Sequence, residues 1–217
     1  METSKKIADK AHSLFKRYGI RSISMDVIAS ELRISKKTVY QFYSNKDSLV
    51  DTFVDTAIDE NTFRCKVLIE KSDDAIIELY FLLVHALEFY NIINPAVVYD
   101  LEKNHELAYS KFNGHKTLFI HQTIKATIGR GVTAGLYRND FDINVITRFL
   151  LESLELIANP AVFPSTHYSK IKPAEELFAC LISGIVTTAG MDVVNTYKNQ
   201  RGIMFLSNYE DLPFWDH

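Results

Sequence analysis

Residues 24–50 of the chain read SMDVIASELRISKKTVYQFYSNKDSLV. Two serines in this stretch, Ser24 and Ser35, each precede a short run with helical periodicity, and serine is a preferred N-cap residue. The four residues from Ser44 to Asp47 match a capping box in front of a longer apolar-periodic segment. We therefore expect two short helices and then the start of a long one.

A further helix is expected upstream, from Ser4 to Tyr18, with Gly19 placed to end it. Short helices with tight connections over so few residues form a small module. A helix-turn-helix has this organisation, and its second helix enters the major groove of DNA. The sequence therefore predicts a DNA-binding module from about Lys5 to Val50, with residues 36–42 as the recognition helix.

The charge of the chain is divided unevenly. The net charge is −3, yet residues 1–50 carry ten Lys and Arg against five Asp and Glu. The remaining residues carry fourteen basic against twenty-two acidic side chains. A basic end suits a phosphate-binding surface, and an acidic body disfavours DNA contacts elsewhere on the chain.

Within the predicted recognition helix, Val39 is expected to pack inward while its neighbours face the groove. Lysine and glutamine suit the edges of guanine and adenine, and threonine can contact the thymine methyl group. The residues expected on the groove side, with Ser35 as the helix cap, are Lys36, Lys37, Thr38 and Gln41. Those expected to contact phosphates and set the register are Ser24, Tyr40 and Lys46. For either neighbouring lysine taken singly, a generic charged surface helix is the alternative.

Residues 18–29 (YGIRSISMDVIA) and 34–49 (ISKKTVYQFYSNKDSL) resemble the N-terminal domain of the TetR family of bacterial transcriptional regulators. The segment Gly135–Asp140 is similar to a turn often seen in such proteins. The resemblance implies a homodimeric, all-helical protein. Such a protein usually represses transcription until a small ligand binds its C-terminal domain.

Two positions depart from the family pattern. The turn between the two helices usually holds a small residue and then glycine, whereas this chain has Leu32 and Arg33. If the backbone there needs a positive φ, Arg33 is strained; alternatively, its side chain gains a phosphate contact. After Tyr40 a polar aromatic residue usually precedes a buried phenylalanine. Here the order is Phe42 then Tyr43, and Phe42 cannot donate the phosphate hydrogen bond often made there.

The rest of the chain also has helical periodicity and few strand signals. We expect an all-α protein of about nine helices, with a helix-turn-helix DNA-binding domain at 1–46 and a helical ligand-binding and dimerisation domain at 47–217. Beyond the long helix that starts near Lys46, the expected helices are 73–91, one from Pro95, 107–134 with a candidate break at Gly114 and a stop at Gly135, 144–159 and 173–198. The tail from Gln200 has no clear period.

The last two predicted helices carry apolar stripes with small residues beside them. Paired with a symmetry mate, they would form a four-helix dimer interface. The expected interface residues are Phe149, Leu150, Leu154, Leu181, Ile182, Ile185, Val186 and Ala189. Without the family resemblance, an intramolecular core would be the first interpretation of the stripe. A dimer would hold two recognition helices about 34 Å apart and bind a pseudo-palindromic operator.

A pocket for an unidentified small-molecule effector is expected among the middle helices, where aromatic and polar side chains alternate. The candidate residues are Tyr80, His85, Glu88, Phe89, Tyr99, Phe119 and His121, and each is also compatible with a core or surface role. The histidines lack the spacing of metal-ligand pairs, so we expect no metal and no cofactor.

Other classes of protein find little support in the sequence. No nucleophile elbow, paired-carboxylate motif or metal motif is present, so we do not expect an enzyme. Polar residues interrupt the most apolar stretch, 76–93, which disfavours a membrane span, and the charged N-terminus disfavours a signal peptide. We expect a cytoplasmic, ligand-responsive DNA-binding repressor. The alternative is a helical interaction or sensor protein with weakened DNA binding.

Overall fold

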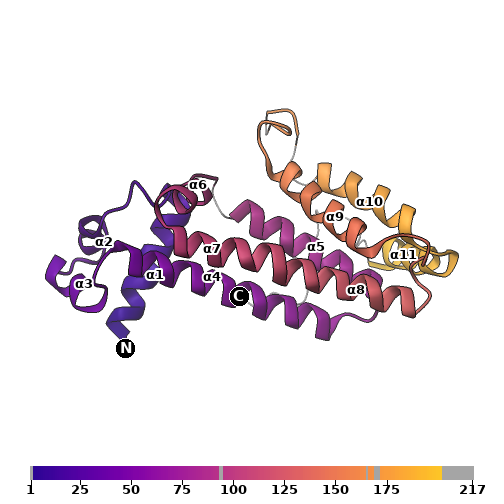
Figure 1. Cartoon of the computed structure of the whole chain (residues 1–217), viewed down its shortest axis with the longest axis horizontal. Helices are drawn as coiled ribbons and strands as arrows, with labels where there is room; N and C mark the ends of the chain where they lie inside the picture. The colour runs from indigo at the N-terminus through magenta and orange to yellow at the C-terminus, as the bar shows by residue number, and fades with distance from the viewer. Residues whose placement is uncertain (1, 93–94, 165, 169–171, 202–217) are drawn as a thin grey trace. The chain divides into compact units, whose positions relative to one another are not determined.

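The computed structural model describes residues 2–92, 95–164, 166–168 and 172–201. Its helices, labelled in Figure 1, are α1 Glu2–Tyr18, α2 Met25–Leu32, α3 Lys36–Phe42, α4 Lys46–Lys71, α5 Ala75–Ile92, α6 Pro95–Asn104, α7 Glu106–Gly114, a π-helical segment His115–Ile120, α8 His121–Thr133, α9 Ile143–Ala158, α10 Lys172–Ile185 and α11 Thr188–Arg201. Over these ranges the chain forms no β-strand. The predicted all-α class is confirmed.

The described residues form two compact units. The first unit takes those within 1–63 and 91–117, and the second takes those within 64–90 and 118–217. The first unit thus joins α1–α3 with the first part of α4 and with α6 and α7. The predicted domain boundary after residue 46 stays a prediction.

One side of α1 is buried in the first unit. Ile7, Ala11, Leu14 and Phe15 recur at helical spacing on it, and the Phe15 ring meets the Phe53 ring of α4 edge-on, with centroids 5.7 Å apart. Gly19 follows with φ +81°, a conformation that other residues rarely adopt. The predicted helix and its stop at Gly19 are confirmed.

The helix caps of the first unit are short polar side chains. Ser24 Oγ accepts from the Val27 N–H at 3.2 Å, and Ser35 Oγ accepts from the Thr38 N–H at 3.0 Å, both as predicted. The capping box of α4 is shifted by one residue: Asn45, not Ser44, accepts from the Ser48 N–H at 2.9 Å. Asparagine and serine cap helices about equally well, so neighbouring candidates compete and backbone geometry decides.

The second unit is built around α5, in which every side chain from Ala75 to Leu87 is buried. A helix that is apolar nearly all round is expected to lie centrally. Asp74 caps it, because its Oδ1 accepts from the Ile76 N–H at 2.8 Å and the Ile77 N–H at 3.1 Å. Tyr197 of α11 donates its hydroxyl to the other Asp74 oxygen at 2.7 Å, so the cap also fixes α11.

Two predicted helices are broken in the structure. The segment expected at 107–134 consists of α7, the π-helical segment and α8, with the change falling after Gly114 as predicted. The helix expected at 173–198 was wrong as a single element, because α10 and α11 are separated at Val186 and Thr187. The described part of the chain therefore has eleven α-helices where about nine were expected.

The break between α10 and α11 has a long-range cause. The Thr187 N–H donates to the Leu136 carbonyl at 2.9 Å, and the Arg138 N–H donates to the Ile185 carbonyl at 2.8 Å. These bonds occupy backbone groups that a continuous helix would use for itself. They depend on a segment about fifty residues upstream, so local periodicity does not reveal them.

No helix within the described ranges is long and apolar enough to cross a membrane. A search of the same residues finds no group of His, Cys, Asp or Glu side chains placed to hold a metal ion.

Candidate nucleic-acid interface

Within the first unit, α2 and α3 form a helix-turn-helix, and α1 packs on α2. Arg33, in the turn between α2 and α3, has φ 56° and ψ 38°. Its N–H bonds to the Ser30 carbonyl at 3.0 Å, and the Ile34 N–H bonds to the Ala29 carbonyl at 3.0 Å. This is the helix ending that glycine usually provides, so the backbone strain expected at Arg33 is present. Its side chain is exposed, and a phosphate contact stays a prediction.

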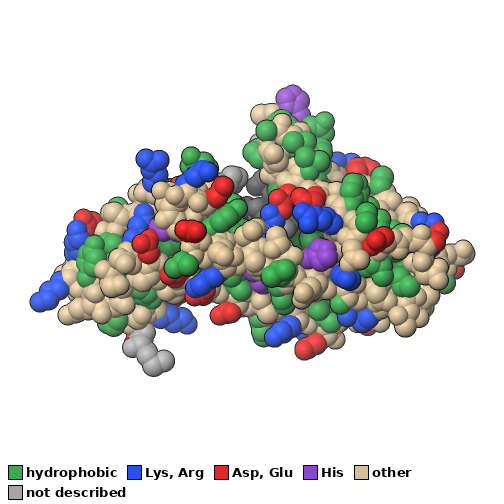
Figure 2. All heavy atoms as spheres, viewed as in Figure 1, with side chains coloured by type: hydrophobic (Ala, Val, Ile, Leu, Met, Phe, Trp, Pro, Cys, Tyr) green, Lys and Arg blue, Asp and Glu red, His purple; other side chains and the backbone are tan. Residues whose placement is uncertain are grey.

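The short helix α3 has one anchored side and one open side. Val39 is fully buried, while Thr38 is half-buried. The side chains that α3 exposes toward solvent include Lys36, Lys37, Tyr40 and Gln41. Residues three or four apart share a side of a helix, so the two lysines lie beside the tyrosine and the glutamine. Figure 2 shows Lys and Arg side chains in blue over α2 and α3, at the left of the view, with acidic side chains in red among them.

The predicted serine contacts already have structural roles. Ser24 and Ser35 accept hydrogen bonds as helix caps, and Ser35 Oγ also lies 2.7 Å from Thr38 Oγ1. A hydroxyl that accepts a bond keeps its own proton to donate. Ser24 can therefore cap α2 and still donate to a phosphate oxygen. Of the two hydroxyls of Ser35 and Thr38, one donates to the other, so only one of their two protons is left for a phosphate or a base.

Lys36 is held by Asp26, in the first turn of α2. Its Nζ lies 2.8 Å from one carboxylate oxygen and 2.9 Å from the other, and 5.9 Å from the centroid of the Tyr40 ring. The hydrogen bond and the charge of Asp26 raise the pKa of Lys36 above its usual value. Lys37, the next residue, has no hydrogen bond or ion pair among the described residues. The two adjacent lysines are therefore electrostatically different.

Lys46, predicted to contact phosphate, is folded back into the first unit. Its Nζ donates to the Ile20 carbonyl at 2.6 Å, in the loop between α1 and α2. Burial lowers the pKa of this lysine, and the charges of Asp100 and Asp47 oppose that shift. In this conformation Lys46 braces the loop, so a phosphate contact would require its side chain to turn outward.

Asp100, on α6, is a contact that no sequence motif indicated. Its side chain is buried, and its Oδ2 accepts from the backbone N–H of Arg21 at 2.8 Å. The same oxygen lies where a Cβ on Gly19 would come within 3.4 Å. Asp100 and Lys46 thus hold the α1–α2 loop from two elements. A single acidic residue on a polar helix gives no local signal of such a role.

Replacing Asp100 with alanine is expected to lower the free energy of unfolding by about 2 kcal/mol, because the Arg21 N–H loses a charged acceptor in a buried place. Glu102→Ala is the matched control, since Glu102 is on the same helix and pairs with exposed Lys103 at 3.7 Å. Denaturant unfolding of both variants measures the difference. Equal stability would show that the Asp100 bond does not hold the loop.

The aromatic pair that ends α3 is reversed relative to the family pattern, and the structure shows its consequence. Phe42, where the pattern has a polar aromatic residue, is 44% exposed, and Tyr43, where the pattern has a buried phenylalanine, is half-buried. Tyr43 accepts from Ser4 Oγ at 3.2 Å and donates to the Ser4 carbonyl at 3.3 Å. The end of α3 is thus tied to the start of α1. The missing phosphate hydrogen bond at Phe42 stays a prediction.

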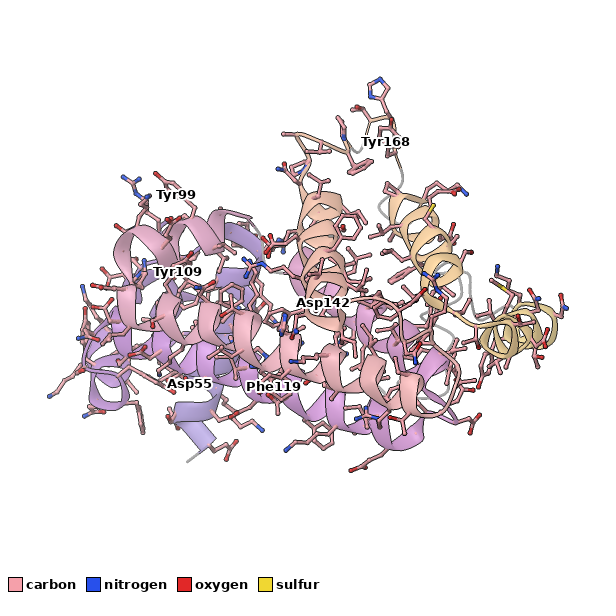
Figure 3. All side chains as sticks on the ribbon, turned by 45° about the vertical axis from the view of Figure 1, so that its right-hand side comes forward. Asp55, Tyr99, Tyr109, Phe119, Asp142 and Tyr168 are labelled. Atoms are coloured by element: carbon pink, nitrogen blue, oxygen red, sulfur yellow. The ribbon has the colours of Figure 1, made fainter. Side chains whose placement is uncertain are left out.

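The residues predicted for a ligand pocket are not gathered in one unit. Tyr99 is 57% exposed on α6 of the first unit and points away from that helix (Figure 3). In the second unit, Phe119 and His121 are half-buried. The members on α5 are Tyr80, His85 and Phe89, all buried, and Glu88, whose side chain lies outside the described residues. The structure therefore groups only part of the predicted set.

Tyr80 is the member of this set whose buried hydroxyl lacks a hydrogen-bond partner among the described residues. Its ring lies 5.9 Å from the Phe178 ring of α10. Burial raises the pKa of Tyr80, and the charge of Glu175 adds to that shift. The hydroxyl therefore stays protonated and can act as a donor.

The predicted dimer residues separate into two groups. Within the second unit, Leu150, Leu154, Ile182, Ile185 and Val186 are buried. Phe149 is 55% exposed, Leu181 is half-buried and Ala189 is exposed. The buried five pack in the core of this chain, as the intramolecular alternative requires. A dimer interface formed by α9 and α10 stays a prediction.

Comparison with known proteins adds to this geometry. Residues 7–52 match the family of bacterial regulatory proteins described as the tetR family. The chain is 23% identical over 165 residues to the uncharacterized HTH-type transcriptional regulator YdeS of Bacillus subtilis, covering 74% of this chain and 77% of that protein. It is 24% identical over 150 residues to the HTH-type transcriptional repressor KstR2 of Rhodococcus jostii, covering 68% and 74%.

A solved structure shares the fold. The transcriptional regulator FadR from Bacillus subtilis, in complex with stearoyl-CoA, superimposes with a TM-score of 0.64 over 83% of this chain and 98% of that one, at 14% identity. The matched segment, residues 7–52, contains the helix-turn-helix with its caps and its exposed α3. The N-terminal helix-turn-helix of this chain is therefore a DNA-binding domain of the tetR family of bacterial regulatory proteins.

Proposed function

We propose that this chain acts in the cytoplasm as a homodimeric repressor that binds a pseudo-palindromic operator and leaves it when a small-molecule effector binds. The observation that carries the proposal is α3, which exposes Lys37 and Gln41 while Val39 anchors it. A lysine ammonium can donate to guanine O6 and N7, and a glutamine amide can pair with adenine. The repressor named KstR2 among the relatives supports repression as the direction of control.

The exposed side of α9 supports dimerisation. Val145, Phe149 and Leu156 are each more than half exposed, and their spacing places them on one side of that helix. The neighbouring α10 exposes small residues, which include Ala179, Ser183 and Gly184. Large apolar side chains next to small ones allow two helix pairs to approach closely. A second copy of the chain would cover this surface as a four-helix interface.

The second unit supports effector binding through the Tyr80 hydroxyl. A buried donor without a partner costs free energy, and an acceptor group on a bound molecule would recover it. FadR, with the same fold, is a complex with stearoyl-CoA, so the fold can hold a small molecule. The effector must bind the DNA-free and DNA-bound states with different affinity, because otherwise it changes nothing.

The base-reading role of Lys37 gives the test of this function. Duplexes enriched by the wild-type protein from a randomised pool should share a motif, and Lys37→Ala is expected to relax preference at one position of each half-site. A loss of about tenfold in affinity for the enriched duplex corresponds to one lost base contact. Sequencing of the enriched pools and a binding titration measure both effects.

Lys66→Ala is the matched control, because Lys66 is an exposed lysine farther along the chain, in α4. It should leave the motif and the affinity unchanged. If Lys37→Ala enriches the same motif as the wild-type protein, Lys37 does not read bases.

A helical interaction or sensor protein with weakened DNA binding is the second candidate. Three observations favour it: the strained backbone at Arg33, and the engaged ammonium groups of Lys36 and Lys46. Failure of the wild-type protein to enrich any motif would favour this candidate over the repressor.

A further inference from the structure

The ion pair between Asp26 and Lys36 joins the two helices of the helix-turn-helix at its exposed side. Their side chains are 61% and 55% exposed. An exposed ion pair contributes little to folding stability. Its position indicates a role in DNA binding instead. The pair places a carboxylate beside the first lysine of the predicted recognition helix, among the groups that would approach DNA.

A carboxylate in that position changes what Lys36 offers to a phosphate. The affinity of a protein for DNA of any sequence comes mainly from cations that neutralise phosphates and release counterions. The charge of Lys36 is already neutralised by Asp26 at 2.8 Å. A phosphate that binds Lys36 would therefore have to displace the Asp26 carboxylate, and one anion would only take the place of another. Asp26 itself repels any phosphate that approaches. Lys37, without such a partner, is free of both effects.

A base edge offers Lys36 something that a phosphate does not. Guanine presents O6 and N7 as two adjacent neutral acceptors, and the amino group of the paired cytosine is a donor that an aspartate can accept from. At such a step the lysine and the aspartate can both keep hydrogen bonds. Elsewhere along DNA the pair stays closed and the carboxylate opposes binding.

From these contacts we propose that Asp26 is a specificity-determining residue, which withholds Lys36 from phosphates so that Lys36 contributes only at its cognate base step. The proposal rests on the DNA-binding function proposed above. Asp26 would then weaken binding to random DNA more than binding to the operator. Asp26 also lies in the first turn of α2, where its negative charge interacts favourably with the helix dipole. The test must separate this structural role from the proposed effect on specificity.

The test compares Asp26→Asn with the wild-type protein on two probes: the duplex that wild-type protein enriches from a randomised pool, and a shuffled duplex of the same composition. Asp26→Asn should bind the shuffled duplex about tenfold more tightly. The slope of its affinity against salt concentration, on logarithmic scales, should steepen by about one unit for each helix-turn-helix bound, as one added phosphate contact would. Affinity for the enriched duplex should change by less than about threefold. The ratio of the two affinities therefore falls.

Glu31→Gln is the matched control. Glu31 is also an exposed acid of α2, and it pairs with Lys10 of α1 at 3.5 Å. Glu31→Gln removes the same charge as Asp26→Asn. It should therefore change the affinities for the enriched and the shuffled duplex by the same small factor and leave their ratio unchanged. If Asp26→Asn keeps the ratio as Glu31→Gln does, Asp26 contributes only general charge and the proposal is overturned.

A second pair of variants tests the same proposal without altering the start of α2. Lys36→Gln should weaken binding to the enriched duplex and leave the shuffled duplex nearly unchanged, whereas Lys37→Gln should weaken both. Equal losses on both duplexes for Lys36→Gln would overturn the proposal. If the wild-type protein does not distinguish the two duplexes, the DNA-binding function itself fails, and this result is visible before any variant is compared.

Discussion

Replacing Gly131 with alanine is expected to lower the free energy of unfolding by about 3 kcal/mol. A Cβ on Gly131 would lie 2.2 Å from Cδ2 and 2.4 Å from Cε2 of the Tyr137 ring, and 3.1 Å from the Ala75 Cβ. The ring has no room to move, because it is buried and its hydroxyl donates to the Ala75 carbonyl at 2.9 Å. Denaturant unfolding measures the loss.

Gly129→Ala is the control for that prediction, in the same helix. No atom lies within 4 Å of a Cβ at Gly129, so the substitution should raise stability by up to about 1 kcal/mol through helix propensity. Equal stability of the two alanine variants would mean that the packing of α8 against Tyr137 can admit a methyl group without strain.

Replacing Phe149 with glutamate is expected to dissociate the proposed dimer and weaken binding to the enriched duplex by about a hundredfold. The side chain is 55% exposed on α9, so the chain itself should still fold. A charge at the centre of an apolar interface would be buried without a partner, which opposes association. Each helix-turn-helix would then bind its half-site without the help of the other. Sedimentation velocity measures the dimer, and a binding titration measures the DNA.

Leu107→Glu is the matched control for Phe149→Glu, since Leu107 is 76% exposed on α7 and outside the proposed interface. It should stay dimeric and bind DNA as the wild-type protein does. A Phe149→Glu protein that remains dimeric at micromolar concentration would exclude α9 from the interface.

Features that depend on near neighbours could be predicted from the sequence. The caps at Ser24 and Ser35 require only a short polar side chain and a free N–H two or three residues ahead. The stop at Gly19 and the change after Gly114 are likewise local. For the same reason the exposed side of α3 could be predicted, because one buried residue, Val39, sets the direction of the others.

Features that depend on distant parts of the chain could not be predicted. The break between α10 and α11 needs the Leu136 carbonyl, and the inward turn of Lys46 needs the Ile20 carbonyl. The role of Asp100 needs the Arg21 N–H, nearly eighty residues away. Charge and propensity describe what a side chain can do, whereas these contacts decide what it does.

The apolar stripe over α9 and α10 shows a different limit. Leu150 and Phe149 are adjacent in sequence and equally apolar, yet one is buried and the other exposed. Helical periodicity gives a set of apolar positions but not which of them face the chain's own core and which face a partner. The apolar side chains of α9 that remain exposed can be identified only from the folded structure, once it is known which of the others pack in the core.

The affinity of the wild-type protein for its enriched duplex and for a shuffled duplex, measured across salt concentrations, tests the DNA-binding function most directly. A specific regulator should bind the enriched duplex at least about a thousandfold more tightly, and both affinities should fall steeply as salt rises. Equal and weak binding to the two duplexes at every salt concentration would contradict sequence-specific recognition by α3.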